Sequence, residues 1–163
     1  MAKKIASSAP SKTPAQATVA GNRRAYHDYF IDETIEAGIV LTGTEVKSLR
    51  LGQASLVDCY ARIRDGELWI EGLHIPPYEQ GDKRTHEPMR PRKLLVHRRQ
   101  IEALRRDASE KGLSLVPLRL YFSHGIAKVE IAVARGKRQH EKRQAIATRD
   151  AQREAERELG RRR

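Results

Sequence analysis

The sequence predicts a mainly β fold: a small antiparallel barrel of about six strands with two or three helices. Three observations lead to this prediction. Short runs carry apolar residues at every second position, two stretches have helical spacing, and the last thirty residues are too polar to join a core. The 163 residues are enough for one domain with a real core. On pattern alone, a flattened sheet with helices on one side fits almost as well.

Three pairs of predicted strands follow one another along the chain. The first pair is residues 29–31 and 39–41. The second is a hairpin with its turn at Asp65-Gly66, and its alternating apolar side chains are Val57, Cys59, Ala61, Ile63, Leu68 and Ile70. The third is a hairpin with its turn near His124-Gly125, and its alternating side chains are Leu118, Leu120, Phe122, Val129, Ile131 and Val133.

Two segments have the spacing of helices. TEVKSLR is a short one that stops at Gly52. VHRRQIEALRRDASEKG is the other, with an apolar face of Ile101, Leu104 and Ala108 and a stop at Gly112. Residues 76–93 hold four prolines, so we expect a loop over most of that stretch.

The excess of positive over negative charge lies at the two ends of the chain. The formal net charge is +11. Residues 25–133 hold sixteen basic and sixteen acidic groups, whereas residues 1–24 hold five basic and no acidic ones. We therefore divide the chain into a disordered basic arm (1–21), a folded domain (22–133) and a basic tail (134–163). Such an excess of charge attracts polyanions.

The sequence gives little support to catalysis or metal binding. The six histidines lack metal-ligand spacing, and glycine-rich phosphate loops are absent. Cys59 is the only cysteine, on the apolar side of a strand, so we expect a buried, inert thiol and a reducing cytoplasm. Asp32, Glu33 and Glu36 could form an acid–base pair, but nothing favours it. We expect no catalytic residue, metal, cofactor or membrane span.

Nucleic-acid binding has positive support from aromatic residues beside arginines. Tyr26, His27 and Tyr29 follow Arg23-Arg24, Tyr121 lies two residues from Arg119, and Tyr78 lies in the basic loop. Arginine contacts phosphate and aromatic rings stack on unpaired bases. Trp69 is left as a structural residue. The alternative is that each ring only fills core or surface.

The tail has the spacing of a helix with two charged stripes. Arg149, Arg153 and Arg157 form a basic stripe, and Asp150, Glu154 and Glu158 form an acidic one. Without an apolar face, such a helix is marginal alone in water. We expect a tail that is disordered when free and folds on a polyanion. A solvated tail without a partner is the alternative.

Several blocks in order resemble one known family. GTEVKSLR (43–50), PRKLLVH (91–97), LVPLRLYF (115–122) and ARGKRQHEKR (134–143), with NRRAYHDYFIDETIEAGIVLTG before them, resemble small protein B, the bacterial tmRNA-binding or SsrA-binding proteins. The resemblance runs from Asn22 to the C-terminus. It implies an oligonucleotide-binding-like barrel and a tail that becomes helical on the ribosome. It also implies an RNA-binding adaptor of trans-translation, which brings tmRNA to stalled ribosomes.

The resemblance also implies site residues. Glu36, Leu95 and Lys128 match positions for tmRNA contact, and Glu36 would act indirectly, because a carboxylate repels phosphate. The complete predicted tmRNA-binding set is Asn22, Arg24, His27, Tyr29, Glu36, Lys93, Leu95, Tyr121 and Lys128. Gly136, Lys137, Arg138 and His140 match the start of the family tail. The predicted ribosome-binding tail set adds Lys142, Arg143, Arg149, Arg153 and Arg157.

The expected partners follow from the same resemblance. They are the tRNA-like domain of tmRNA and the small-subunit ribosomal RNA at the decoding centre and mRNA channel. Elongation factor Tu and alanyl-tRNA synthetase would be reached through tmRNA. We expect a cytoplasmic monomer. Two rival hypotheses are a constitutive ribosomal protein and an RNA-processing enzyme.

Overall fold

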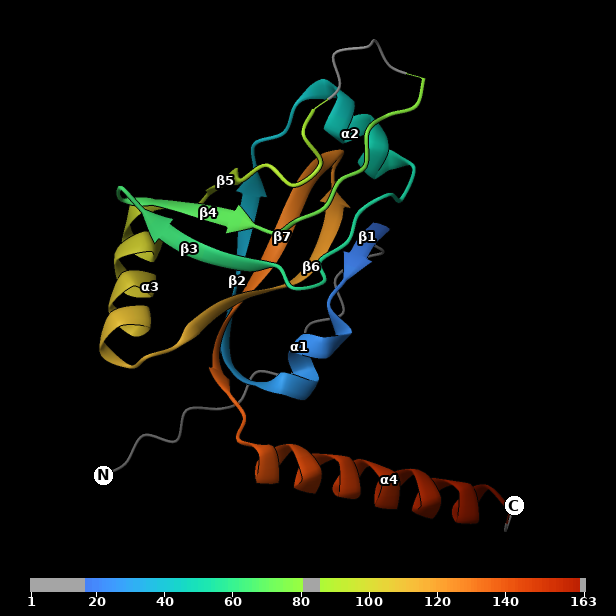
Figure 1. Ribbon diagram of the computed structural model, residues 1–163. Helices are drawn as coiled ribbons and strands as arrows, with labels where there is room; N and C mark the ends of the chain where they lie inside the picture. Colours follow the sequence, from blue (N-terminus) through green and yellow to red (C-terminus); the bar gives the residue numbers. More distant parts are fainter. Residues whose placement is uncertain (1–16, 81–85, 162–163) are drawn as a thin grey trace.

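A computed structural model describes residues 17–80 and 86–161 (Figure 1). Four helices are described: α1 (Arg23–Asp28), α2 (Gly43–Arg50), α3 (Arg98–Glu110) and α4 (Gln139–Arg161). Seven strands accompany them: β1 (Ala17–Gly21), β2 (Tyr29–Ile39), β3 (Tyr60–Arg64), β4 (Glu67–Glu71), β5 (Arg92–Leu95), β6 (Ser114–Ser123) and β7 (Ile126–Gly136). None of the described helices has the length and apolar character of a membrane span.

The strands close into an antiparallel ring. The order is β6-β3-β4-β5-β2-β7, and β7 pairs back with β6. β1 pairs with the later half of β6, whereas β3 meets the same strand only at its start, where Ala61 lies opposite Leu115. The predicted small barrel is therefore confirmed, and the flattened sheet is wrong. Closure leaves few unpaired strand edges around the core.

The predicted pair of strands at 29–31 and 39–41 is wrong, because β2 is one continuous strand. It pairs with β7 from Tyr29 opposite Gly136 to Gly38 opposite Lys128, with a register shift between Ile31 and Glu33. The polar residues between the two apolar runs are exposed rather than turning. A long partner strand can satisfy the backbone hydrogen bonds of a polar segment, so local apolar runs underestimate the length of the strand.

Three elements were not predicted, because β1, β5 and α1 carry no strong local pattern of their own. β1 consists of small residues and lies within the arm predicted to be disordered, so that prediction is wrong for Ala17–Gly21. Residues 1–16 lie outside the described residues. β5 occupies the end of the predicted loop. Each depends on pairing with a distant segment, which local spacing does not reveal.

The two predicted hairpins are confirmed, with one correction in each. Val57 is 66% exposed, because Asp58 has a positive φ of 58° and β3 starts only at Tyr60. Leu118 does not share a face with Leu120, because a register shift follows Pro117 in β6. It packs instead in a second cluster under α1. The hairpin also reaches Gly136, three residues into the predicted tail.

The main core fills the ring. Its fully buried members include Leu68, Ile70, Leu120, Val129 and Ile131. The predicted helices are confirmed as α2 and α3, and α3 buries Leu104 against the barrel. The disorder predicted for the tail is not confirmed, because α4 is helical and extends away from the barrel beside α1 (Figure 1).

Candidate nucleic-acid interface

Strand register places three of the predicted RNA-binding residues in one row. Leu95 of β5 lies opposite Gly38 of β2, Gly38 lies opposite Lys128 of β7, and Lys128 lies opposite Tyr121 of β6. Their neighbours Leu94, Val129 and Leu120 point into the core. Residues directly opposite each other share a face of the sheet, so Leu95, Lys128 and Tyr121 lie on the outer face of the barrel.

Leu95 is an exposed apolar side chain at the β5 end of this row. It is 53% exposed. A Cβ added to Gly38 would lie 3.3 Å from the Cβ of Leu95, so the glycine leaves room for the leucine beside it. Leu95 thus offers an uncharged surface next to a lysine, which suits a sugar or base edge beside a phosphate.

Glu36 of β2 contacts two members of this row, Lys128 and Tyr121. Its carboxylate accepts hydrogen bonds from the Lys128 ammonium and from the Tyr121 hydroxyl. These two bonds, the one from Lys128 first, lower the pKa of Glu36. The carboxylate therefore stays charged and holds Lys128 in one orientation, in agreement with the indirect role predicted for Glu36.

Tyr121 is not a stacking surface. It is only 2% exposed, and the Arg119 guanidinium lies over its ring, 4.6 Å from the centroid. Burial raises its pKa, and the bond to Glu36 raises it further. The stacking role predicted for Tyr121 is wrong, and its hydroxyl serves to orient Glu36.

Arg119 belongs to the same surface, although the predicted tmRNA-binding set named only its neighbour Tyr121. It lies opposite Glu130, which in turn lies opposite Glu36, so these residues form a second row beside the first. Arg119 forms an ion pair with Glu130 and keeps 40% of its side chain exposed. Tyr26 of α1 is partly exposed and lies near both charges. Its partial burial, followed by the negative charge of Glu130, raises its pKa, while Arg119 acts in the opposite direction. The position of Arg119 beside Glu130 and Glu36 depends on the register of β6, β7 and β2, which local sequence does not reveal.

Lys93 lies at the border of this surface, two residues before Leu95. Its ammonium pairs with Glu67 at 2.5 Å, and it lies opposite Trp69. The Arg64 guanidinium covers the Trp69 ring at 4.8 Å. Trp69 is half-buried beneath this guanidinium, and its structural role stays a prediction, whereas Lys93 is partly neutralised by Glu67.

The remaining predicted tmRNA residues form a separate group around α1. Tyr29 and Gly38 stand at opposite ends of β2, about 30 Å apart at the usual rise per residue. Asn22 caps α1: its Oδ1 accepts from Ala25 N at 3.2 Å, and its Nδ2 donates to Pro117 O at 3.1 Å. Tyr29 packs in the second cluster. Arg24 and His27 expose 73% and 41% of their side chains.

A cleft of about 770 Å³ adjoins the α1 group, between α1, β3, α3 and the start of β6. Its lining includes the basic residues Arg24, Arg62 and Arg105. Cys59 also lines it but is buried, and burial raises its pKa to about 12. The predicted burial of this thiol is confirmed, and a thiol whose pKa is raised by burial stays protonated at neutral pH.

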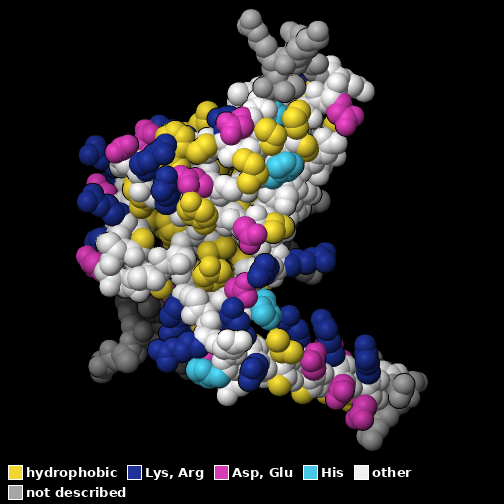
Figure 2. Space-filling model, in the orientation of Figure 1, with side chains coloured by type: hydrophobic (Ala, Val, Ile, Leu, Met, Phe, Trp, Pro, Cys, Tyr) yellow, Lys and Arg dark blue, Asp and Glu magenta, His cyan; other side chains and the backbone are white. Residues whose placement is uncertain are grey.

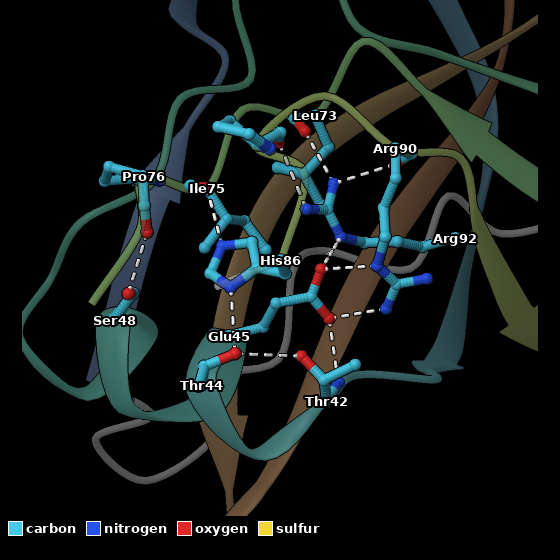
Figure 3. A network of polar contacts seen from close by, with 11 residues as sticks. Thr42, Thr44, Glu45, Ser48, Leu73, Ile75, Pro76, His86, Arg90 and Arg92 are labelled. Carbon is cyan, nitrogen blue, oxygen red and sulfur yellow. Dashed lines mark hydrogen bonds and ion pairs between the residues drawn. The ribbon is translucent and has the colours of Figure 1, made fainter. Parts of the chain in front are cut away.

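A buried ionic network supports the strand that carries Leu95 (Figure 3). Glu45 of α2 and Arg92 of β5 are both fully buried. Glu45 accepts from Arg90 at 2.7 and 2.5 Å, from Arg92 at 2.8 Å and from Thr42 N at 2.8 Å. Arg92 also donates to the carbonyls of Leu73, Pro88 and Arg90. No local pattern in the sequence indicates this network, because charged residues usually lie at the surface.

Two further contacts tie the loop before β5 to α2. His86 bonds to Thr44 Oγ1 at 3.0 Å and to Ile75 O at 2.9 Å, while Ser48 Oγ donates to Pro76 O at 2.8 Å (Figure 3). The segment TEVKSLR thus supplies three side chains, Thr44, Glu45 and Ser48, that fix the entry into β5 and hence the position of Leu95.

The predicted tail residues divide between β7, its exit and α4. Gly136 ends β7, and Arg138 N donates to Glu141 at 2.8 Å as α4 begins. His140 and Arg143 are exposed, as are the stripe residues Arg149, Arg153 and Arg157. Figure 2 shows basic side chains along one side of α4 and acidic ones along another. The described residues contain no group of His, Cys, Asp and Glu suited to a metal ion.

The chain is similar to known proteins over most of its length. The sequence model described as "SmpB protein" matches residues 19–161. An SsrA-binding protein of Acidothermus cellulolyticus is 62% identical, covering 88% of this chain and 91% of the relative. One from Thermobifida fusca is 60% identical, covering 90% and 91%. One from Mycobacterium is 55% identical and covers 99% of this chain and 96% of the relative, so similarity extends into the N-terminal arm.

The fold of the chain is similar to that of a solved structure. It is described as "tmRNA-SmpB: a journey to the center of the bacterial ribosome". It has a TM-score of 0.62 and 49% identity, and the match covers 77% of this chain and 92% of the solved one. Because the family match spans most of the sequence and the curated relatives are more than half identical to it, the chain belongs to the SmpB protein family.

Proposed function

We propose that this chain binds the tRNA-like domain of tmRNA and brings it to stalled ribosomes, as an RNA-binding adaptor without chemistry of its own. The observation that carries the proposal is the outer row that presents exposed Leu95 and Lys128, with Lys128 oriented by Glu36, which Tyr121 holds in turn. The names of the relatives and the ribosomal context of the solved structure support the same partners. We name Leu95, Lys128, Arg119 and Tyr26 the barrel RNA surface.

The division of labour between barrel and tail is part of the proposal. The barrel would hold tmRNA, while Arg149, Arg153 and Arg157 of α4 would contact small-subunit ribosomal RNA in the mRNA channel and at the decoding centre. The exposure of these arginines supports it. Elongation factor Tu and alanyl-tRNA synthetase would be reached through tmRNA. The folded unit would run from β1 to the end of β7, and the tail would follow it.

Lys128→Ala is expected to weaken tmRNA binding by about ten-fold or more, because a positioned phosphate contact is lost. The slope of log affinity against log salt should fall by about one contact. Gel-shift titrations over a range of salt, with equal-length competitor RNA present, would measure both quantities. Lys111→Ala is the matched control, since Lys111 is an exposed lysine paired with Asp107 at 2.7 Å on α3. An unchanged slope in Lys128→Ala would contradict the phosphate contact.

Leu95→Ala gives a different signature in the same titration. An apolar side chain releases no counterion, so the affinity for tmRNA should fall while the salt slope stays at its original value. Equal affinity of the unaltered chain for tmRNA and competitor RNA would overturn the proposed function, because the basic ends alone would then explain binding.

A further inference from the structure

The contact between α1 and the root of α4 is built around one carboxylate. Asp28, the last residue of α1, receives the Lys142 ammonium of α4 at 3.1 Å on Oδ1. His27 Nδ1 lies 2.9 Å from the same oxygen, and Arg24 Nε lies 3.2 Å from Oδ2. The bonds from His27 and then Lys142 lower the pKa of Asp28, so the carboxylate is charged at neutral pH.

The main chain makes the same connection. Lys137 N donates to the Asp28 carbonyl at 2.8 Å, and Lys137 Nζ donates to the Tyr26 carbonyl at 3.1 Å. The carbonyls at the end of a helix lack partners within it and carry partial negative charge, so cations are favourable there. The Arg135 guanidinium and the Lys137 ammonium lie over the Phe30 ring, 5.1 and 4.9 Å from its centroid. Lys137 and Lys142 therefore hold the exit of β7 against α1.

In the described part of α4, Lys142 is the last residue that forms an ion pair with α1. Every residue from Ile146 to Gly160 is exposed, and α4 lies beside α1 only at its root (Figure 1). A helix of this length acts as a lever, because a small rotation at the root displaces its far end by many ångströms. The contacts at the root therefore set where the arginine stripe points.

We propose that Asp28 is a positioning residue that fixes the direction in which α4 leaves the barrel. The positioning role itself does not depend on the proposed function. Its biological use does, because there the tail contacts ribosomal RNA while the barrel holds tmRNA. The contact is ionic, and both partners remain partly exposed at 24% and 33%. Salt or competing phosphates can therefore loosen it.

The test measures the spread of distances between barrel and tail in the free protein. Spin labels are attached at Gln53→Cys and Gln152→Cys, both exposed positions. Cys59 is buried, with its pKa raised to about 12, and does not compete for the label. We expect Asp28→Asn to widen the distance distribution at least about two-fold, because an amide attracts Lys142 much less strongly than a carboxylate does.

Asp107→Asn is the matched control. Asp107 is 23% exposed, close to the 24% of Asp28, and it also pairs with a lysine, but on α3. It should leave the distribution as in the unaltered chain. Lys142→Met breaks the contact from the tail side without touching the barrel fold, and it should widen the distribution as Asp28→Asn does. An unchanged distribution in Lys142→Met, or equal widening in Asp107→Asn, would overturn the inference.

This result is separable from the proposed function. Gel shifts of the unaltered chain report whether tmRNA is bound specifically, and the distance distribution reports whether Asp28 holds α4. Failure of tmRNA binding with widened distributions would refute the function and leave the positioning role intact. Specific tmRNA binding with unchanged distributions in both variants would support the proposed function and refute the positioning role of Asp28.

Discussion

Removal of residues 139–163 is expected to abolish peptide tagging on stalled ribosomes while leaving tmRNA affinity within about two-fold of the full chain. The tail carries the exposed basic stripe, whereas the barrel RNA surface lies on β5, β6, β7 and α1. The cut belongs at 139, because residues up to Gly136 are part of β7 and Lys137 contacts α1. Tagging in a reconstituted stalled-ribosome reaction and gel shifts with tmRNA measure the two activities separately.

A scrambled tail of the same composition is the matched control for this truncation. It keeps the charge but breaks the alignment of Arg149, Arg153 and Arg157. If the stripe matters, the scrambled tail should tag poorly although its net charge is unchanged. A truncated chain that no longer binds tmRNA would contradict the division between barrel and tail.

Glu45→Gln is expected to lower the free energy of unfolding by roughly 3 kcal/mol or more, because it leaves buried Arg92 without its counter-charge. Urea unfolding at neutral pH measures this loss. Glu67→Gln is the matched control: Glu67 also forms an ion pair, with Lys93 at 2.5 Å, but is 42% exposed. Its loss should stay within about 1 kcal/mol. Equal losses in the two variants would contradict the special role of burial.

The same carboxylate predicts how stability depends on pH. The contacts to Arg90, Thr42 and Arg92 outweigh the cost of burial and hold the pKa of Glu45 at about 2, below its ordinary value of 4.5. Its contribution to stability is therefore complete above that ordinary value and is lost as the pH falls toward 2. Between pH 5 and 2, Glu45→Gln should show a flatter decline of unfolding free energy than the unaltered chain. Parallel declines would contradict the shifted pKa.

The fold was predictable where a local pattern and its turn agree. Asp65-Gly66 marks the β3–β4 hairpin, Gly52 ends α2, and alternation along β6 and β7 indicates a hairpin. β1 and β5 were not predictable, because four or five residues of small or charged type gain their strand structure only from a partner far away in sequence.

The site was predictable in part for a related reason. Alternation places Lys128 outward, and this is confirmed, but Leu95 and Glu36 were selected only through the family resemblance. Their meeting depends on the register of β5 against β2 and of β2 against β7. The buried pair of Glu45 and Arg92 was hidden more deeply, because nothing in the local spacing of a charged residue reveals a partner forty-seven positions away.

The outer row has a thermodynamic consequence, because it exists only when four separate stretches of chain are in their native register. A partly unfolded chain lacks the row, so an RNA that binds it selects the native state. At a free RNA concentration one hundred times its dissociation constant, such a ligand stabilises the fold by about 2.7 kcal/mol. Occupied molecules should therefore resist proteolysis better than vacant ones, and the cellular lifetime of the protein should follow the supply of its RNA.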